Sequence, residues 1–377
     1  MGRSVALALR RAGARVAVVD PGEPERQAGW AAGGMLAPLA EAPGSGAFLA
    51  LAQASLSRYP DYVAELEEAS GLDVGLHLDG KLLTAFGAAD TEALRKRFAW
   101  QERDGHPVEW LRGAEVRRME PSVGHDVEAG LLLRGNGRVD NRSLLKALVA
   151  ACAAAGVEEH RDRVGAIVEA QGRIRGARLD SGGVVEAPTV ILAAGAWSGR
   201  IEGLPRPLPV RPVKGQMLAL GTPGRPLTRV VTSAAAYLIP RESPGGPVIV
   251  VGATEEEAGF DLAVGDPGQR DLRTGAIRLV PSLADAPVVE RWAGLRPGSP
   301  DGLPILGPDP DLEGLCYATG HYRNGILLAP ITGERVAAWW TSGDASEIED
   351  VLRPERLEGG PGRVPDPPPK PTLPEEV

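Results

Sequence analysis

One arginine in the last third of the sequence has the chemistry to bind a carboxylate. Arg296 lies in the segment 292–298, which reads WAGLRPG, and a guanidinium forms two parallel hydrogen bonds to the oxygens of one carboxylate. Tyr237 lies in a stretch that predicts a strand, and its phenol could add another donor. Taken singly, an arginine is more often a surface residue and a strand tyrosine more often part of the core.

A glycine-bounded loop follows a short apolar strand predicted at residues 315–318. The loop reads TGHYRNGI over residues 319–326, and a helix is expected from about Pro330 to Trp340 with proline in its first turn. The N-terminus of such a helix carries a partial positive charge that stabilises an anion forming on a bound ligand. An ordinary strand-to-helix connection is the alternative interpretation.

The first twenty residues read as the second half of a dinucleotide-binding βαβ unit. Helix formers over residues 3–12 precede Gly13, which predicts a helix end, and a β-branched run then ends in Asp20. In a complete unit a strand feeds a G-x-G-x-x-G turn, and an acid roughly 20 residues later binds a ribose hydroxyl. Gly2 matches the third glycine of that turn and Asp20 matches the acid, which favours an adenine dinucleotide.

The same pattern predicts a strand and two glycines before Met1. We therefore expect that the sequence as written starts inside the unit, and that roughly a dozen upstream codons encode an apolar strand and its glycine turn.

A second small-residue segment lies between Arg26 and Pro38, where the sequence reads RQAGWAAGGMLAP. Such a run allows the backbone to approach a flat ligand and to offer its N–H groups. Composition alone favours the alternative, a flexible linker.

The composition is that of an ordinary globular protein. The chain has 377 residues, 43% hydrophobic and 24% charged, which is enough for a large core and suggests two domains. Its net charge of -9 argues against a nucleic-acid partner. No apolar stretch approaches the ~20 residues of a membrane span, and no signal peptide is recognisable. We expect a cytoplasmic protein without a membrane or nucleic-acid partner.

The metal-binding residue types show no ligand spacing. Cys152 and Cys316 are the two cysteines, and they are too far apart to predict a metal site or a disulfide framework. Each is expected to be a small buried hydrophobe, which suits a reducing cytoplasm. With five dispersed histidines, we predict no metal.

Apolar periodicity and turn signals predict the remaining elements. Helices are expected at residues 49–66, 90–103, 141–155 and 271–279; Pro60 would kink or divide the first, and Asn141 or Ser143 would cap the third before Gly156 ends it. Strands are expected at 81–86, 131–133, 164–168, 174–179 and 189–194. The pair around Gly172 predicts a hairpin, and the last strand is expected to be buried on both faces of a parallel sheet. Residues 208–253 predict an antiparallel sheet.

Together these segments closely resemble the glycine oxidase group of the D-amino acid oxidase superfamily, flavoenzymes that bind FAD. The resemblance runs from Gly2 to about Leu357. It is carried by residues 30–38, 137–140 (GRVD), 192–198 (LAAGAWS), 213–216 (VKGQ), 294–297 (GLRP) and 319–326. The last two motifs together are the most specific. Members can carry a histidine where this chain has Ala235, which bears on the preferred substrate.

The resemblance assigns roles to residues at matching positions. Substrate binding would fall to Arg296, which holds the carboxylate, with Tyr237 and Arg323. Noncovalent FAD would be bound by Gly2, Asp20, Pro21, Ala28, Gly29, Gly33, Gly34, Met35, Val164, Gly195, His321, Tyr322, Arg323, Asn324, Gly325, Ile326 and Leu327. Related sarcosine oxidases attach flavin through a cysteine, but Cys316 is not at a matching position.

The fold that the resemblance implies is α/β, or α+β with two domains. It comprises a Rossmann-like FAD-binding domain, truncated at its N-terminus, and a substrate domain with an antiparallel sheet. The first would take residues 1–42, 131–200 and 291–357, and the second residues 43–130 and 201–290. Residues 358–377 hold seven prolines and are expected to form a disordered tail.

The activity that the resemblance implies is oxidative deamination of glycine, sarcosine or D-alanine. Oxygen would be the acceptor, and the products would be a 2-oxo acid, ammonia or an amine, and hydrogen peroxide, supplying the thiazole branch of thiamine biosynthesis. One alternative is a D-amino acid dehydrogenase that uses a quinone. Another is a flavin-free, noncatalytic protein, suggested by the missing first strand. The state of oligomerisation is left open.

Overall fold

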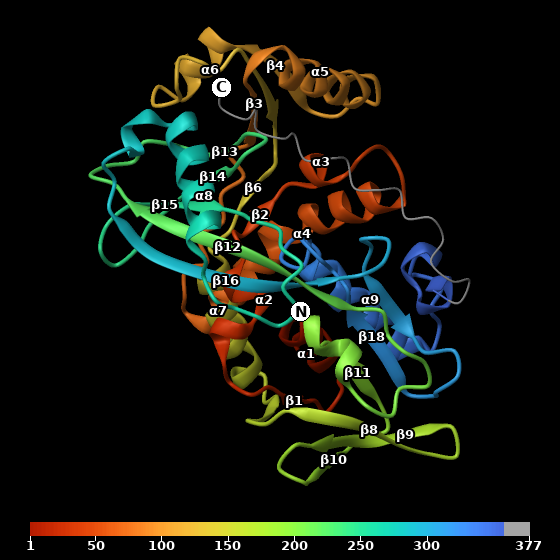
Figure 1. The fold of residues 1–377 in the computed structure, drawn as a ribbon. Coiled ribbons are helices and arrows are strands. Elements are labelled where there is room, and N and C mark those ends of the chain that lie inside the picture. The colour runs from red at the N-terminus through yellow and green to blue at the C-terminus, as the bar shows by residue number, and fades with distance from the viewer. Residues whose placement is uncertain (358–377) are drawn as a thin grey trace.

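Eight strands form one mixed sheet through the middle of the molecule (Figure 1). The computed structural model describes residues 1–357. In spatial order the strands are β16 (Val288–Gly298), β12 (Arg211–Gly221), β15 (Val248–Gly252), β14 (Tyr237–Arg241), β13 (Val230–Thr232), β3 (Lys81–Ala85), β5 (Ala129–Leu133) and β4 (Val108–Arg112). Only β13 and β3 are parallel neighbours. The antiparallel sheet predicted over residues 208–253 is confirmed, and it extends further than predicted.

The two faces of this sheet pack against different parts of the chain, because alternate side chains of a strand point to opposite faces. On one face, Leu218 and Val251 share an apolar cluster with α8 (Asp266–Leu279). On the other face, Met217 packs with Ala31 of α2 (Ala28–Ala31). The second face carries the candidate site.

A second group of elements surrounds the start of the chain. It contains two parallel strand pairs, β1 (Ala17–Val19) with β7 (Glu158–His160) and β11 (Val190–Leu192) with β18 (Leu315–Thr319); β17 (Ile305–Pro308) pairs antiparallel with β18. α1 (Gly2–Arg11) packs against α9 (Ala329–Ser342). Within residues 1–357 no strand joins β1 to β18. The strand and glycine turn expected before Met1 stay a prediction.

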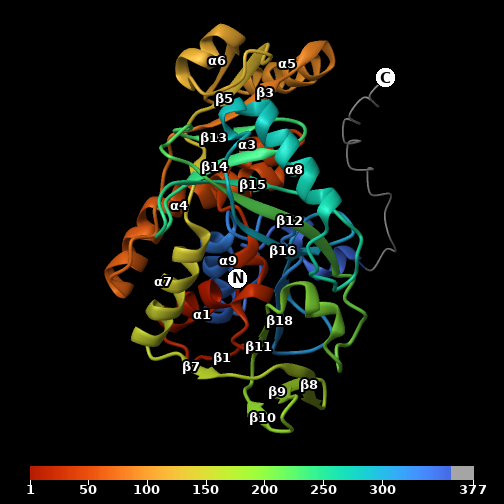
Figure 2. The same cartoon turned by 60° about the vertical axis from the view of Figure 1, so that its left-hand side comes forward.

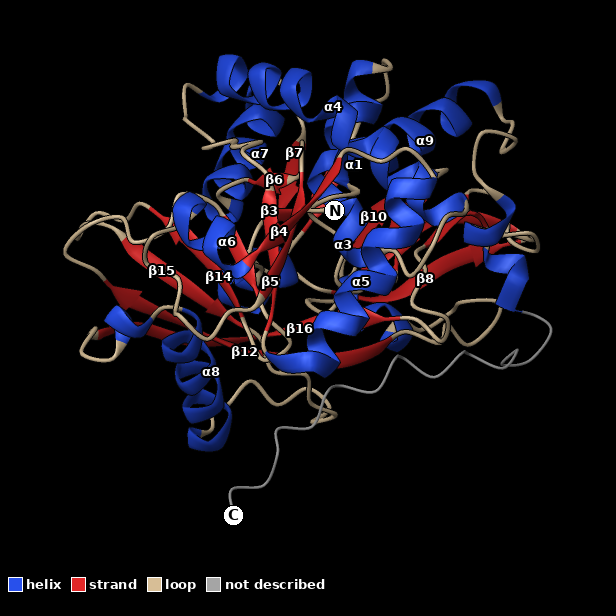
Figure 3. Ribbon diagram, turned by 90° about the horizontal axis from the view of Figure 1, so that it is seen from above, coloured by secondary structure: helices blue, strands red, loops and turns tan. Residues whose placement is uncertain are grey.

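Long helices cover this second group. α4 (Ala47–Ser70) packs on α9 and on α7 (Asn141–Ala154) and buries Tyr59 completely. Pro60 lies inside α4 without ending it. Seen from above, α1, α4, α7 and α9 lie on the opposite side of β12 and β16 from α8 (Figure 3). Among the described helices, we find none with the length and apolar character needed to span a bilayer.

Further helices and strands complete the described chain. The helices are α3 (Pro38–Glu41), α5 (Gly87–Arg103) and α6 (Gly113–Met119), with 3-10 turns at Pro24–Arg26, Gly195–Arg200, Pro281–Leu283, Asp350–Leu352 and Pro354–Leu357. The strands are β2 (Met35–Leu36), β6 (Gly137–Arg138), β8 (Val164–Ala170), β9 (Arg173–Leu179) and β10 (Val184–Glu186). Figure 2 shows β8, β9 and β10 at the end of the molecule farthest from α5 and α6.

The mixed α/β fold and most of the predicted elements are confirmed, with two local corrections. The cap of α7 is Asp140, whose Oδ1 accepts the N–H of Ser143 at 2.8 Å, and not Asn141 or Ser143 themselves. β11 packs on both faces as predicted, with Ile191 against one apolar cluster and Leu192 in another, but Val190 and Ile191 are only half-buried, because within the described residues the strand lies at the edge of its sheet and pairs only with β18. The tail predicted at 358–377 lies outside the described residues, and the division into two domains stays a prediction.

Replacing Gly294 by alanine should lower the free energy of unfolding by about 1–3 kcal/mol. A Cβ at Gly294 on β16 would lie 2.3 Å from the Cβ of Ala31, so α2 would have to move off the sheet. Urea unfolding measures the effect, with Gly224→Ala as control because nothing lies within 4 Å of that position. Equal unfolding midpoints for the two variants would contradict the close contact.

Candidate functional site

Tyr237 and Arg296 project from the same face of the eight-stranded sheet. Across the sheet, Tyr237 pairs with Gly252, Gly252 with Met217, and Met217 with Trp292. Arg296 lies four residues beyond Trp292 on β16, and an even spacing along a strand keeps side chains on one face. Both residues predicted from the sheet to bind substrate therefore lie on the face that packs against α2.

Backbone carbonyls hold the guanidinium of Arg296. Its Nη1 donates to the carbonyls of Lys214 and Thr254, and its Nη2 donates to that of Thr254, all at 3.2 Å. Gly215 leaves room for the group, because a Cβ there would lie 2.4 Å from Nη1 and from Nη2. A guanidinium has five N–H donors. In Arg296, the Nε–H and one N–H of Nη2 have no hydrogen-bond partner among residues 1–357. These two N–H bonds are parallel to one another, so they can bind the two oxygens of one carboxylate.

Tyr237 is packed tightly beside this arginine. Its hydroxyl lies 3.1 Å from the sulfur of Met217, and a Cβ at Gly252 would lie 2.3 Å from the same hydroxyl. Burial raises the pKa of Tyr237, and the nearby guanidiniums of Arg296 and Arg323 oppose that rise. The phenol is therefore neutral near pH 7 and can donate a hydrogen bond.

Arg323 reaches the site from the loop after β18. Its Nε lies 3.3 Å from a carboxylate oxygen of Glu41, the last residue of α3. The preceding residue, Tyr322, has a φ of +49°, which is uncommon outside glycine, and its hydroxyl donates to Glu255 at 2.7 Å. Burial and then Glu255 raise the pKa of Tyr322 to about 12, while Arg296 and Arg323 oppose the rise. The two loop residues therefore lie close to the arginine of β16.

The small-residue segment 27–35 lies directly over Tyr237. A Cβ at Gly33 would lie 2.7 Å from Ile239 and 3.3 Å from the ring of Tyr237. Gly34 has a φ of +78°, and a Cβ there would lie 2.1 Å from the carbonyl oxygen of Val139. Because both positions exclude a side chain, the segment is packed against the sheet and is not a loose linker.

Three side chains that sequence reasoning missed fasten this segment by donating to its carbonyls. They are Asn141 (to Gly29 at 2.7 Å and Trp30 at 2.8 Å), Arg241 (to Gly33 at 3.1 Å) and Trp292 (to Ala31 at 2.9 Å). The only signal in the sequence was the place of Asn141 before a helix, which we interpreted as a cap.

The N-terminus of α1 lies close to Asp20. The carboxylate of Asp20, just after β1, accepts from the side-chain amide of Gln27 at 3.1 Å. Burial lowers the pKa of the α-amino group of Met1, and the charge of Asp20 opposes this, so the two groups are near one another. Gly2 is the first residue of α1. It lies close to the residue after β11, because a Cβ added at Gly2 would lie 3.4 Å from the Cβ of Ala193. The first N–H groups of a helix have no partner within the helix and can bind phosphate.

Three other residues predicted to bind the nucleotide are Pro21, Val164 and Gly195. Pro21 is exposed beside Asp20. Val164 begins β8, and its neighbour Arg163 pairs with Glu23 at 2.6 Å, which ties this strand to the segment after β1. Gly195 follows β11 with a φ of +57° and begins a 3-10 turn.

The loop 321–327 contains a buried polar atom without a partner. Nε2 of His321 lies 3.1 Å from the hydroxyl of Thr332, and burial lowers the pKa of His321 to about 3. Asn324 is 7% exposed, and its Oδ1 has no hydrogen-bond partner within residues 1–357. Leaving such an oxygen unsatisfied is costly, and an N–H of a flavin ring would satisfy it. With the α1 terminus and Asp20, the residues present fit FAD.

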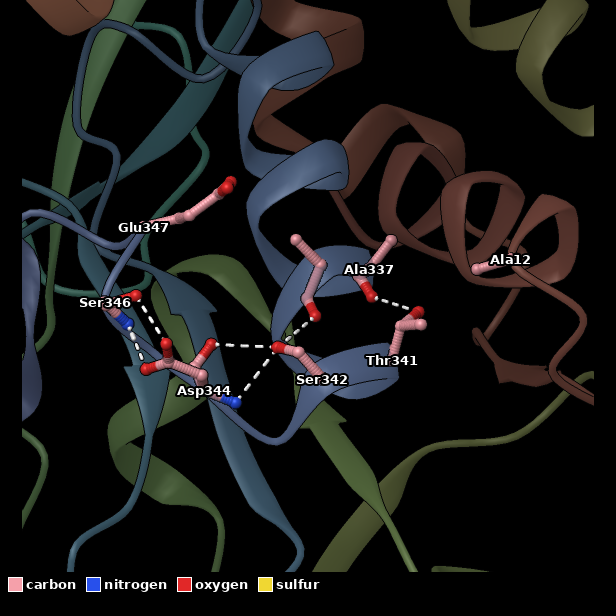
Figure 4. Close-up of a pocket in the computed structure, with 8 residues that line it drawn as sticks. Ala12, Ala337, Thr341, Ser342, Asp344, Ser346 and Glu347 are labelled. Carbon is pink, nitrogen blue, oxygen red and sulfur yellow. Dashed lines mark hydrogen bonds between the residues drawn. The ribbon is translucent and has the colours of Figure 1, made fainter.

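Other features of the surface are separate from this site. A hollow of about 460 Å³ lies at the end of α9, lined by Ala12, Ala337, Thr341 and Ser342 among others (Figure 4). None of its lining residues is a predicted site residue. In the described part of the chain, no group of histidine, cysteine, aspartate and glutamate side chains could hold a metal ion.

The segment 27–35 links the residues predicted to bind a dinucleotide with those predicted to bind a substrate, because Gln27 donates to Asp20 and Gly33 packs against Tyr237. Such an arrangement would suit an oxidoreductase whose dinucleotide lies beside its substrate. The chain belongs to the DAO family of FAD dependent oxidoreductases, which matches residues 1–339. The expected family and its FAD cofactor are thereby confirmed.

Curated relatives and solved structures agree with this family. The chain is 38% identical over 343 residues to the bifunctional protein ThiO/ThiG of Nostoc sp., with 89% of this chain and 50% of that protein covered. It is 37% identical to glycine oxidase of Pseudomonas aeruginosa, covering 88% and 89% of the two chains. The crystal structure of glycine oxidase from Geobacillus kaustophilus superposes with a TM-score of 0.85 at 31% identity, covering 93% and 95%. The chain thus spans about half the length of the bifunctional relatives.

Replacing His321 by glutamine should make the protein less sensitive to acid. Below pH 6.5 the unfolded chain binds a proton at this residue, whereas the folded chain does so only near pH 3, so wild-type stability falls as the pH falls. Between pH 7 and pH 5 the variant should lose about 2 kcal/mol less free energy of unfolding than the wild type. Urea unfolding at both pH values measures this. The exposed His125→Gln is the control and should follow the wild type; parallel losses in all three proteins would contradict the prediction.

Proposed function

We propose that the protein is an FAD-dependent oxidase of small amino acids, with glycine, sarcosine and D-alanine as substrates and hydrogen peroxide as a product. The observation that carries this proposal is the parallel pair of N–H groups on Arg296. They lie on the sheet face that also carries Tyr237, and Gly33 of the small-residue segment packs against the ring of that tyrosine. A site of this kind binds a carboxylate and leaves the α-carbon next to a flat ligand.

The chain's own residues contribute mainly by positioning the substrate. When bound, FAD accepts the hydride from the α-carbon and passes the electrons on to oxygen. Arg296 fixes the carboxylate in two hydrogen bonds, and Tyr237 adds a neutral donor. The guanidiniums of Arg296 and Arg323 disfavour a further positive charge on the substrate amine. They therefore promote the neutral amine that hydride removal needs.

The cofactor would extend from the start of α1 to the sheet. Asp20 would bind the ribose, Val164 the adenine through its backbone, and Gly2 with Gly195 would border the phosphates. Ala28, Gly29 and Gly33 to Met35 would line the ring, and the loop 321–327 would bind its pyrimidine side, where the amide oxygen of Asn324 lacks a partner. We infer noncovalent attachment, since both thiols are fully buried and burial raises the pKa of each.

The biological role that follows from the resemblance is supply of the thiazole branch of thiamine biosynthesis, with glycine as the substrate. The 38% identity to a bifunctional ThiO/ThiG protein supports this role. The substrate preference within the group remains part of the proposal, because Ala235 replaces the histidine that some members carry.

The protein purified with FAD should release hydrogen peroxide when it is given glycine, sarcosine or D-alanine in air. A coupled peroxide assay with parallel oxygen consumption measures this. Reduction of a quinone-like dye without peroxide would instead support the dehydrogenase alternative. A preparation that stays colourless after incubation with FAD would support the noncatalytic alternative.

Replacing Arg296 by lysine should lower kcat/KM for glycine by about 10- to 100-fold, because the charge is kept while the parallel pair of hydrogen bonds is lost. Steady-state kinetics measures the effect. The matched control is Arg270→Lys, an exposed arginine on α8 at the opposite face of the sheet, and it should retain wild-type kinetics. Unchanged kcat/KM in the Arg296 variant would exclude a role in carboxylate binding.

A further inference from the structure

A buried lysine lies on the substrate-facing side of the sheet without a charged partner of its own. Lys81 begins β3 and is 3% exposed. It is two residues from Leu83, which pairs with Thr232, and Thr232 pairs with Tyr237. Even spacing places Lys81 on the same face as Tyr237.

The ammonium group of Lys81 makes few contacts. Its one hydrogen-bond partner within residues 1–357 is the sulfur of Met35, at 3.4 Å, and a thioether is a weak acceptor for a group with three donors. No carboxylate of the described residues forms an ion pair with it. A buried charge left in this way is costly. Met35 belongs to the segment that we propose lines the flavin, so the ammonium borders the site.

The charges around Lys81 are mostly positive. Burial lowers its pKa to about 8; Glu41 opposes this, and Arg323 and Arg97 add to it. At neutral pH the amine is therefore still protonated in most molecules. Glu41 already pairs with Arg323 at 3.3 Å, and Arg97 is turned to the carbonyls around α3, including that of Leu39 at 2.8 Å. Glu41 is thus the carboxylate that acts on all three cations, and Glu255 adds to its effect on Arg323 alone. Within residues 1–357 Lys81 is left without an ion pair, and an anion would be stabilised beside it.

We propose that Lys81 and Arg323 form a subsite for a second anionic group of the substrate. The α-carboxylate binds Arg296, and the distal group lies between Lys81 and Arg323, so that Lys81 determines specificity. The enzyme then prefers amino acids with a distal carboxylate, on the side chain or on the nitrogen, over neutral analogues of the same size. This inference rests on the proposed function, because it concerns the same site.

The test compares charged and neutral substrates in pairs. We would measure kcat/KM for D-aspartate against D-asparagine, D-glutamate against D-glutamine, and N-carboxymethylglycine against N-ethylglycine. The wild type should favour the charged member of at least one pair by 10-fold or more. Lys81→Met keeps an unbranched side chain only one atom shorter and removes the charge. It should reduce that preference by about 10- to 100-fold and change kcat/KM for glycine by less than about twofold, which also shows that the variant folds. Lys96→Met removes an exposed lysine of α5 and should leave every ratio unchanged.

Binding of unreactive acids tests the subsite without turnover. Calorimetry should show that the FAD-loaded protein binds succinate at least 10-fold more tightly than succinamate, and that Lys81→Met abolishes the difference. A wild type without a charge preference, or a preference that survives in Lys81→Met, would overturn the inference. Glycine oxidation with no preference would refute the subsite alone. Absence of any amino acid oxidation would refute the proposed function, and the calorimetry would then decide about the subsite.

Discussion

The contact between Ala31 and Gly294 is the constraint on which the site depends. Without a side chain at Gly294, α2 lies directly on β16, and the indole N–H of Trp292 donates to the carbonyl of Ala31 at 2.9 Å. This contact fixes where the following residues run. Gly33 is thereby placed against Tyr237, and Met35 reaches the ammonium of Lys81. A bulkier residue at the contact would lift the segment away from the sheet.

Arg142 strengthens the same contact from the side of α7. Its guanidinium lies 3.8 Å from the ring centre of Trp30 and 4.9 Å from that of Trp292, and it forms two hydrogen bonds with Glu290. Cation–π contacts of this kind gain strength when water is excluded. The helix, the segment 27–35 and the sheet are therefore joined by packing, hydrogen bonds and charge together. A rigid frame of this kind is what positional catalysis requires.

The sequence predicted the local elements and the residue types of the site better than it predicted how they are held. Periodicity and glycine punctuation located α1, α5 and α8, and the motifs around Arg296 and Arg323 indicated the family. The residues that fasten the site, such as Arg241 and Trp292, carry no local signal, because their partners are carbonyls distant in sequence. Lys81 could not be recognised from the sequence for the same reason. A single lysine at the start of a strand is common, and only the strand register shows that it shares a sheet face with Tyr237. The cap of α7 was predicted wrongly as Asn141 or Ser143, because Asp140 and both of these residues are good capping types.

We propose that the free N–H pair of Arg296 receives the substrate carboxylate on the sheet face against which segment 27–35 packs. The decisive measurement is a crystal structure of the FAD-loaded protein with hydroxyacetate, an unreactive analogue of glycine with the same carboxylate. We expect both carboxylate oxygens to bind Nε and Nη2 of Arg296, with the bonds from Arg296 to the carbonyls of Lys214 and Thr254 retained. A carboxylate bound elsewhere, or an Arg296 side chain that leaves those carbonyls to reach it, would contradict the account.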